Sequence, residues 1–415
     1  MSSTGEGEAP AVYRGYRPRP ALIPVSNGRV DRNKPVDYLR SLVGLAPNPP
    51  VAENAETPFV GITVDGNPIP GLFELADEDL DPAPVVAAAE NWLAALAPAD
   101  RARASVAVDG SEWRLWTNAF PAWEPHGICL DTLSETQRDA AVEVLRASMS
   151  ARGFADVREA MYLNGALATL TGQYTDSLKE WMYWLTIFGA PSVTEPWGWQ
   201  LAGHHVDVNC LIIGRQLVMT PTFLGAEFDS DRIFSTQRQA ALELYASLPD
   251  SPRKTAVLYP SMDPEDLPFE LGGRVDGRHL GGAGQDNRII PYAGVCAADL
   301  TPGQQELLLA LADTFTVRLP EGPARHRHAA IASQLANTYF SWIGPAGPED
   351  AFYFRIHSPV VLAEYDNHPG IFLDFDKPEP FHVHTVVRTP NGNDYGKDLL
   401  RAHYAAHHHP GSNHP

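Results

Sequence analysis

Cysteine is scarce in this sequence, and its few copies are widely scattered. The 415 residues include only three, Cys129, Cys210 and Cys296. Such a small and dispersed set excludes a disulfide framework and a metal cluster held by thiolates. The reducing cytoplasm is therefore the default compartment, and we expect a cytoplasmic protein.

Long apolar runs are also missing. No stretch approaches the roughly 18 to 20 apolar residues that a membrane-spanning helix needs. The first residues, "MSSTGEGEAPAVYRGYRPRP", have no apolar segment of the kind found in signal peptides. We therefore expect a soluble protein without a membrane partner.

Positive charge is the third shortage. The chain has 31 Lys and Arg against 51 Asp and Glu, which gives a net charge of −20 with histidine neutral. Such a field repels phosphate backbones and anionic lipids, so we expect no nucleic-acid partner. Because 44% of the residues are hydrophobic, the chain can still bury a large core. The composition predicts a globular protein acting on a small molecule, and it leaves an oligomer open.

The composition changes along the chain and divides it into three segments. Residues 1–55 are rich in Pro, Gly and Arg and predict a flexible leader, with a strap lying over the surface as the alternative. Residues 56–405 predict a single large α+β catalytic unit. Residues 406–415, "AHHHPGSNHP", predict a disordered tail whose histidines are solvated.

Helices are indicated by three stretches in which Ser or Thr precedes Gln and an apolar helical period follows. These are "LSETQRDAAVEVLRASM", "FSTQRQAALELYASL" and "LTPGQQELLLALADTF". Ser134 with Gln137, and Thr301 with Gln304, fit the capping box of a helix start. We therefore predict a helix-rich N-terminal half packed on a mostly antiparallel sheet, which is an α+β fold.

Strands are indicated where apolar and polar residues alternate. The run from residue 206 to 212 alternates and leads through "GRQ" into a hairpin, and the run from 353 to 367 gives two strands broken at Ser358–Pro359. A third strand follows in "PFHVHTVVRTP". Since side chains two apart share a face of a strand, three polar groupings are predicted: Arg355 with His357, Glu364 with Asp366, and His382 with His384 and Arg388.

Histidines two apart on a strand have roots about 6 to 7 Å apart and can converge on one ion. A carboxylate from a neighbouring strand can complete a metal site of one or two ions. The proposed metal ligands are His205, His357, His382 and His384. The competing interpretation is an ordinary polar strand face. The isolated His126 and His279 are given no role.

The same motifs resemble a known family. "GHH" at 203–205, "YFRIHSPVVLAEYDN", "HVHTVVR" and "NDYGKDLLRAHY" occur in the order seen in a bacterial and fungal family whose domain has no assigned function. The resemblance spans roughly residues 80 to 405. The chain departs from the pattern at Asp207, where a small or neutral residue is usual, and at Val387, where an aromatic is common. The resemblance implies functional importance for His204, His205, Asn209, Arg355, His357, Glu364, His382, His384, Arg388, Asp394 and His403.

The function predicted from these residues is a metal-dependent hydrolase acting on a small anionic, amide or ester substrate. A divalent ion, with zinc favoured and iron or copper open, would activate water. Glu364 or Asp366 would move the proton, Arg355 or Arg388 would hold an anionic group, and His403 would orient a ligand. Two alternatives stay open: a non-haem iron or copper oxidoreductase with the same ligands, and a metal-free module that binds carboxylates.

Overall fold

A computed structural model of the protein describes residues 12–21, 25–26, 29–30, 51–120, 126–268, 271 and 278–407. Most of the expected leader, the tail beyond His407 and part of the glycine-rich stretch at 271–287 lie outside these residues.

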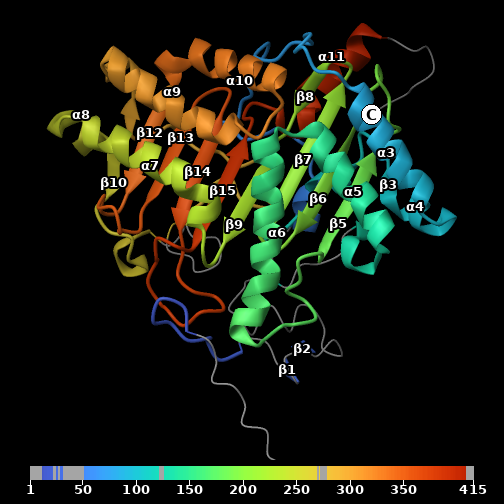
Figure 1. Cartoon of the computed structure of the whole chain (residues 1–415). Coiled ribbons are helices and arrows are strands. Elements are labelled where there is room, and N and C mark those ends of the chain that lie inside the picture. Colours follow the sequence, from blue (N-terminus) through green and yellow to red (C-terminus); the bar gives the residue numbers. More distant parts are fainter. Residues whose placement is uncertain are drawn as a thin grey trace, which may run out of the picture.

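A 13-stranded mixed sheet forms the centre of the described part of the chain (Figure 1). Its strands are β3 (Ser105–Val106), β4 (Ile128–Cys129), β5 (Tyr183–Phe188), β6 (Trp197–Gly203), β7 (Val206–Ile213), β8 (Gln216–Val218), β9 (Thr222–Ala226), β10 (Val257–Tyr259), β11 (Val295–Cys296), β12 (Tyr339–Ile343), β13 (Tyr353–His357), β14 (Leu362–Asn367) and β15 (Val383–Arg388). A separate pair is formed by β1 (Val25–Ser26) and β2 (Arg29–Val30).

The order across the sheet is β10-β12-β13-β14-β15-β9-β7-β6-β5-β3, with β11 beside β12, β4 beside β5 and β8 beside β7. Only β10 with β12 and β3 with β5 pair in parallel among these strands. The hairpin from β7 to β8 and the break between β13 and β14 are where the alternation predicted them. The predicted α+β fold with a mostly antiparallel sheet is confirmed.

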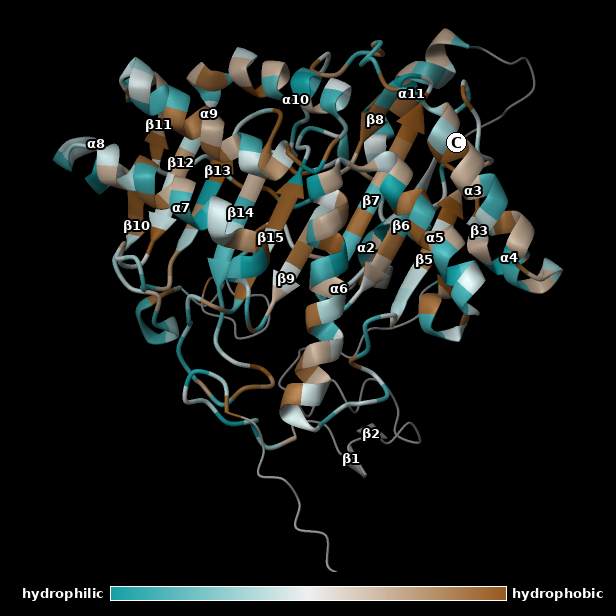
Figure 2. Ribbon diagram, viewed as in Figure 1, coloured by the Kyte–Doolittle hydropathy of each residue, from teal (hydrophilic) through white to brown (hydrophobic). Residues whose placement is uncertain are grey.

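Several helices cover one face of the sheet. The helices of the described residues are α2 (Val51–Glu56), α3 (Ala83–Ala95), α4 (Pro98–Ala104), α5 (Glu135–Ser148), α6 (Ala151–Thr171), α7 (Asp231–Ser247), α8 (Asp250–Ala256), α9 (Pro302–Thr316), α10 (Glu321–Ser333) and α11 (Lys397–Ala406). Figure 1 shows α3, α5, α6 and α7 in front of the strands. Figure 2 shows apolar residues along β15, β7 and β6 beneath them. The largest hydrophobic cluster fills this layer and includes Trp197 and Trp199, both 0% exposed.

The helix starts follow the local signals in the sequence. Ser134 caps α5 and Thr301 caps α9, each with a complete capping box through Gln137 or Gln304. Each side chain of such a pair satisfies a backbone N–H that the first helical turn leaves without a partner. Both predicted capping boxes are confirmed.

The opposite face of the sheet carries the polar residues. In the register, Arg355 lies opposite Glu364, and Asp366 lies opposite His384. Arg388 lies opposite Leu362 at the other end of β15. Residues directly opposite on neighbouring strands share a face, so these side chains all point away from the helix layer. Loops, including residues 278–290, cover this face.

Residues 12–21 of the expected leader lie against the folded body. The hydroxyl of Tyr13 donates to Asp229 Oδ1 at 3.0 Å, and Arg19 N–H donates to the Phe372 carbonyl at 2.8 Å. Tyr13 also packs edge-on against Phe381, with ring centroids 5.2 Å apart. This short part of the chain has the contacts of a strap.

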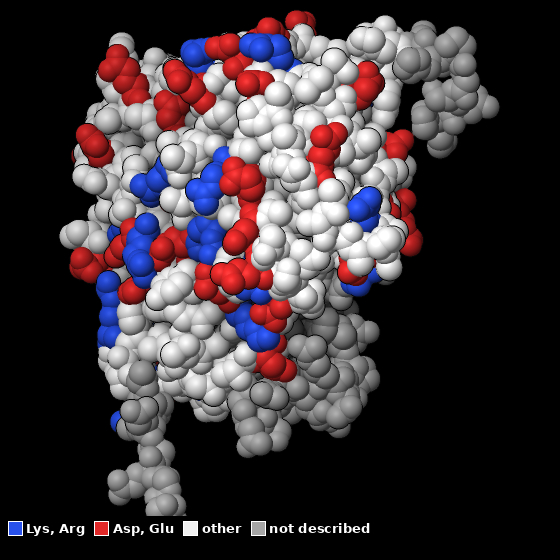
Figure 3. All heavy atoms as spheres, turned by 45° about the vertical axis from the view of Figure 1, so that its right-hand side comes forward, with Lys and Arg blue, Asp and Glu red and all other residues white. Residues whose placement is uncertain are grey.

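Acidic and basic side chains are interspersed on the surface that Figure 3 shows. Many acids pair with neighbouring arginines, as Asp77 and Asp79 do with Arg215 at 2.8 and 3.0 Å. Among the described helices, none is long and apolar enough to cross a bilayer.

Candidate metal centre

Five buried histidines meet where β15 begins. They form two groups of three that share His384: the first contains His205 and His382, and the second contains His279 and His368. Within each group, the nitrogen atoms that could bind an ion lie within 4.8 Å of one another. All five side chains are at most 5% exposed.

The first group has the geometry of a three-nitrogen metal site. Nε2 of His384 lies 3.1 Å from Nε2 of His205 and 3.2 Å from Nε2 of His382. In a tetrahedral zinc site with Zn–N bonds of about 2.0–2.1 Å, ligand nitrogens lie roughly 3.3 Å apart. The three imidazoles are therefore already spaced to bind one ion.

The tautomer of His382 is fixed by its other nitrogen. Nδ1 of His382 lies 2.8 Å from the carbonyl oxygen of Pro369, and a carbonyl only accepts hydrogen bonds. Nδ1 must carry the proton, so in the neutral ring Nε2 offers its lone pair to the cluster. Metal-binding histidines typically have this arrangement, with the second ring nitrogen donating to a carbonyl or carboxylate.

The second group lies against Asp366. His368 Nε2 is 2.8 Å from Asp366 Oδ2, out of hydrogen-bond geometry, and His279 Nε2 is 3.9 Å from the same oxygen. The ring of His368 lies 4.0 Å from that of His384. Among the described residues, His279 Nε2, Nδ1 of His368 and Nδ1 of His384 have no hydrogen-bond partner. Buried polar atoms usually have one, so these nitrogens are available to a ligand.

Two backbone features allow the rings of His205 and His384 to approach each other closely. His205 ends the tight turn between β6 and β7 with φ of 66°, a left-handed conformation that costs most L-residues roughly 1–2 kcal/mol. Gly225 lies opposite His384 on β9. A Cβ atom there would lie 2.7 Å from Cδ2 of His384 and 3.0 Å from Cδ2 of His205. Only glycine leaves room for both rings.

Burial favours the neutral, metal-binding form of His205, His279, His382 and His384. It lowers the pKa of His205 and of His279 to about 3. The pKa values of His382 and His384 are also far below the ordinary value, first through burial and then through the neighbouring imidazoles. Since an imidazole binds a metal only when neutral, no proton has to be removed from these rings at physiological pH.

Comparison with known families assigns the chain to a family. A family model described as "Protein of unknown function (DUF3500)" matches residues 79–397. The chain belongs to the DUF3500 family. The sequence resemblance to a family without an assigned function is thereby confirmed. Searches of curated proteins and of solved structures gave no match. All five clustered histidines lie within the DUF3500 match.

The two carboxylates of β14 hold a loop of the DUF3500 domain over the cluster. Glu364 accepts hydrogen bonds from the N–H groups of Leu280 and Gly281, both at 2.8 Å, and from the Tyr353 hydroxyl at 2.6 Å. Asp366 accepts from Arg278 N–H at 2.9 Å and from its Nε at 2.5 Å. His279 lies between these anchored residues. Burial alone would raise the pKa of Asp366, but Arg278 and His368 hold it below the ordinary range.

These contacts alter the roles expected for the charged residues. Glu364 already accepts three hydrogen bonds, two of them from the backbone of the loop, so it positions that loop. The guanidinium of Arg388 is 0% exposed and donates to Gly281 O, Gly282 O, Asp286 and Asp394, so four of its five N–H donors are already used within the protein. Arg355 differs: its one hydrogen bond to a described residue is a 3.4 Å contact with Tyr353, and its buried Nε has none.

His357 and His403 lie outside both histidine groups. His357 ends β13 at the level of Leu362 and Arg388, whereas His384 is level with Asp366 at the other end of β14. Its ring packs edge-on against Tyr292, with centroids 4.7 Å apart. His403 lies on α11, with Nε2 3.6 Å from Glu195. The structure therefore brings together His205, His382 and His384 of the predicted ligands, and it does not place His357 with them.

Two members of the cluster were missed in the sequence. His368 directly follows the "EYDN" motif, so the end of β14 was a usable signal for it. His279 lies in the glycine-rich stretch, where no periodicity indicates a direction. The tryptophans Trp197 and Trp199 belong to the helix-side core and not to the site.

Proposed function

We propose that the histidine cluster binds divalent metal and that the DUF3500 domain is a metal-dependent hydrolase. The observation that supports this proposal best is the convergence of three Nε2 atoms at 3.1 and 3.2 Å. Nε2 of His384 lies between Nε2 of His205 and Nε2 of His382, and Nε2 of His382 presents a lone pair. One N–H of His384 cannot point well at both neighbours, so at least one pair of nitrogen lone pairs faces each other. A cation bound between the three nitrogens would remove the repulsion between these lone pairs.

A metal with three protein ligands keeps a position for water and lowers the pKa of that water towards neutrality. The protein would supply proton transfer beside it. His279 and His368 are candidates for this step, because their ring centroids lie 5.4 and 4.0 Å from that of His384 and each ring has a nitrogen without a hydrogen-bond partner among the described residues. Alternatively, the same two rings would bind a second ion together with His384.

Arg355 is the residue best suited to hold an anionic substrate. It is 4% exposed, lies on the same face as His384 and has no carboxylate within salt-bridge distance among the described residues. A buried guanidinium without a counter-ion is costly, and a substrate carboxylate would satisfy it in bidentate fashion. We therefore propose a small anionic ester or amide as the substrate class.

An oxidoreductase with iron or copper is the second candidate. It is favoured by the all-imidazole composition of both groups, since imidazole suits copper and iron as well as zinc. A metal-free carboxylate-binding module, resting on Arg355 alone, is the third.

Elemental analysis tests the proposal. Protein prepared without a metal-affinity column should contain at least one zinc per chain and should hydrolyse a small ester with a free carboxylate, such as mono-(4-nitrophenyl) succinate. Iron or copper with redox activity would favour the second candidate. Protein that binds no metal after incubation with zinc, iron or copper would overturn the proposal and leave the binding module.

A further inference from the structure

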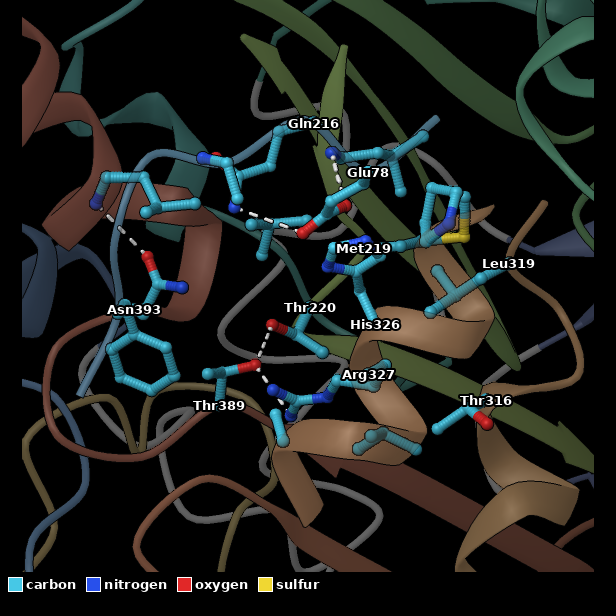
Figure 4. Close-up of a pocket in the computed structure, with 18 of the residues that line it drawn as sticks. Glu78, Gln216, Met219, Thr220, Thr316, Leu319, His326, Arg327, Thr389 and Asn393 are labelled. Carbon is cyan, nitrogen blue, oxygen red and sulfur yellow. Dashed lines mark hydrogen bonds between the residues drawn. The ribbon is translucent and has the colours of Figure 1, made fainter. Parts of the chain in front are cut away.

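A cavity of about 200 Å³ lies between α10, the end of α9 and the far ends of β8, β9 and β15. Figure 4 shows that Arg327 and His326 reach it from α10, while Glu78 and Gln216 approach from the opposite side. Much of the remaining wall is apolar, including Phe315, Leu319 and Val387. A small cavity with an apolar lining and a few convergent polar groups is the usual form of a ligand site.

Arg327 is the main polar group of this cavity. Both of its hydrogen bonds use Nη2, which donates to the Val360 carbonyl at 2.6 Å and to Thr389 Oγ1 at 3.1 Å. Nε and Nη1 have no partner among the described residues, and no carboxylate of those residues lies within salt-bridge distance. Burial lowers the pKa of Arg327 to about 10, although Asp394 and Glu78 act in the opposite direction. No carboxylate of the described residues therefore neutralises this partly buried cation.

Glu78 faces Arg327 across the cavity without touching it. Its two oxygens accept from Gln216 Nε2 at 3.0 Å and from Leu217 N–H at 3.1 Å. Burial raises the pKa of Glu78, and no Lys or Arg of the described residues forms an ion pair with it. Each of its oxygens can accept a second hydrogen bond from a ligand.

The segment that carries Glu78 is fixed by hydrogen bonds and ion pairs to Arg215. The N–H groups of Glu78 and Leu80 both donate to the Arg215 carbonyl, at 3.2 and 3.4 Å. Asp77 and Asp79 pair with the Arg215 side chain. Thr389 is fixed in turn by Thr220, since their hydroxyls lie 2.7 Å apart. The polar groups of the cavity are therefore held in place before any ligand arrives.

This cavity is distinct from the histidine cluster. Thr389 follows the last residue of β15, whereas His384 is near its start. At about 3.3 Å per residue, the two positions are roughly 16 Å apart along the strand. Val387, which lines the cavity, belongs to the helix-side core, and His384 points to the other face.

We propose that this cavity is a second ligand site, which binds a small carboxylate carrying a hydroxyl or amino group at its other end. Arg327 would take the carboxylate through Nε and Nη1, and Glu78 would accept from the hydroxyl or ammonium. The volume admits a compound of only a few non-hydrogen atoms. The site makes no use of the histidines and does not depend on the proposed hydrolase activity.

Calorimetric titration of the full chain with glycolate, glycine, acetate and inorganic phosphate tests this site. Glycolate or glycine should bind, and acetate should bind more weakly because it has no donor for Glu78. Arg327→Gln should weaken the binding at least tenfold. Arg325→Gln is the matched control, because Arg325 lies on the same helix with its side chain 57% exposed and should leave binding unchanged.

Two further variants separate the possible outcomes. Glu78→Gln should remove the preference for glycolate over acetate, and His384→Ala should leave glycolate binding intact. Binding of phosphate alone, binding of none of the four compounds, or glycolate binding that Arg327→Gln does not change would each overturn the proposal. Thermal unfolding of every variant shows that a loss of binding does not come from loss of the fold.

Discussion

Nε2 of His205 and Nε2 of His384 lie 3.1 Å apart, although 179 positions separate the two residues in the sequence. One ring comes from the turn between β6 and β7 and the other from β15, with Gly225 of β9 between them. Two neutral imidazoles gain little from such an approach unless a proton or a cation lies between them. This contact is therefore the structural observation that best supports the proposed metal site.

Replacing His384 with alanine should abolish stoichiometric metal binding, because this ring belongs to both groups. His382→Ala should lose the first group and retain at most weak binding through the second. The matched control is His357→Ala, which removes an equally buried histidine outside both groups and should keep the full metal content. Elemental analysis after dialysis measures the outcome, and equal metal loss in all three variants would contradict the assignment.

Gly225→Ala should weaken metal binding without removing any ligand. The added Cβ would lie 2.7 Å from the His384 ring and would push it away from His205. At Gly282, an added Cβ meets no atom within 4 Å, so Gly282→Ala is the control and should bind metal normally. Competition with a chromogenic chelator gives both affinities. An unchanged affinity in Gly225→Ala would show that the two rings do not share an ion.

Glu364→Gln distinguishes a positioning role from a catalytic one. The amide nitrogen would face one of the two backbone N–H groups that the carboxylate now binds, which should loosen the loop carrying His279. Loss of such an outer contact typically lowers metal affinity or activity by about 10- to 100-fold. If Glu364 were instead the proton acceptor, turnover would fall while metal affinity stayed constant.

Glu227 should make stability depend on pH. Its Oε1 accepts from the N–H groups of Ile371, Phe372 and Leu373, yet burial still raises its pKa to about 7 from 4.5. The carboxyl group of Glu227 therefore binds its proton more tightly in the folded state than in the unfolded state. Stability should fall as the pH rises from about 4.5 to about 7, by up to roughly 3 kcal/mol, and should not change further above that range.

Glu227→Gln keeps an oxygen for the three N–H groups and removes the titration. The stability difference between this variant and the wild type should therefore grow with pH between these limits. Urea unfolding at about pH 5 and about pH 8 measures it. A constant difference at both values would mean that Glu227 is not the group responsible.

Arg388→Met should destabilise the fold strongly, since it leaves Asp286 and Asp394 buried without their shared cation. Removing one partner of a buried ion pair typically costs about 3–5 kcal/mol. Arg401→Met, at a side chain that is 57% exposed, should change stability by no more than about 0.5 kcal/mol. If Arg388 instead held a substrate, Arg388→Met would keep its stability and lose only binding.

Local patterns in the sequence were sufficient for much of the fold. Ser134 and Thr301 marked the helix starts, and the alternation from Arg355 to Arg388 predicted the strands and their polar faces. Both features depend on residues within one turn or one strand. Each therefore leaves a signal that can be found without knowing the tertiary structure.

The order of the strands in the sheet and the positions of the loops leave no local signal in the sequence. His357 and His384 share a face, but β14 separates their strands and they lie at opposite ends of it. His279 reaches the cluster only because Glu364 and Asp366, more than 80 residues further on, anchor its loop. Arg388 carried the right charge for a substrate, yet its partner Asp286 comes from a loop 102 positions earlier in the chain.

The distribution of the ligands along the chain also determines when the site can exist. The first group needs residue 205 as well as residues 382 and 384, and the second needs residue 279. The ribosome must therefore synthesise the chain as far as residue 384, and β9 must pair with β15, before an ion could meet the three nitrogens of the first group. Contacts so distant in sequence form late in folding, because their loop-closure entropy has to be overcome first. Metal loading would then be a final maturation step on an assembled sheet, and metal-free protein should accumulate as a folded species.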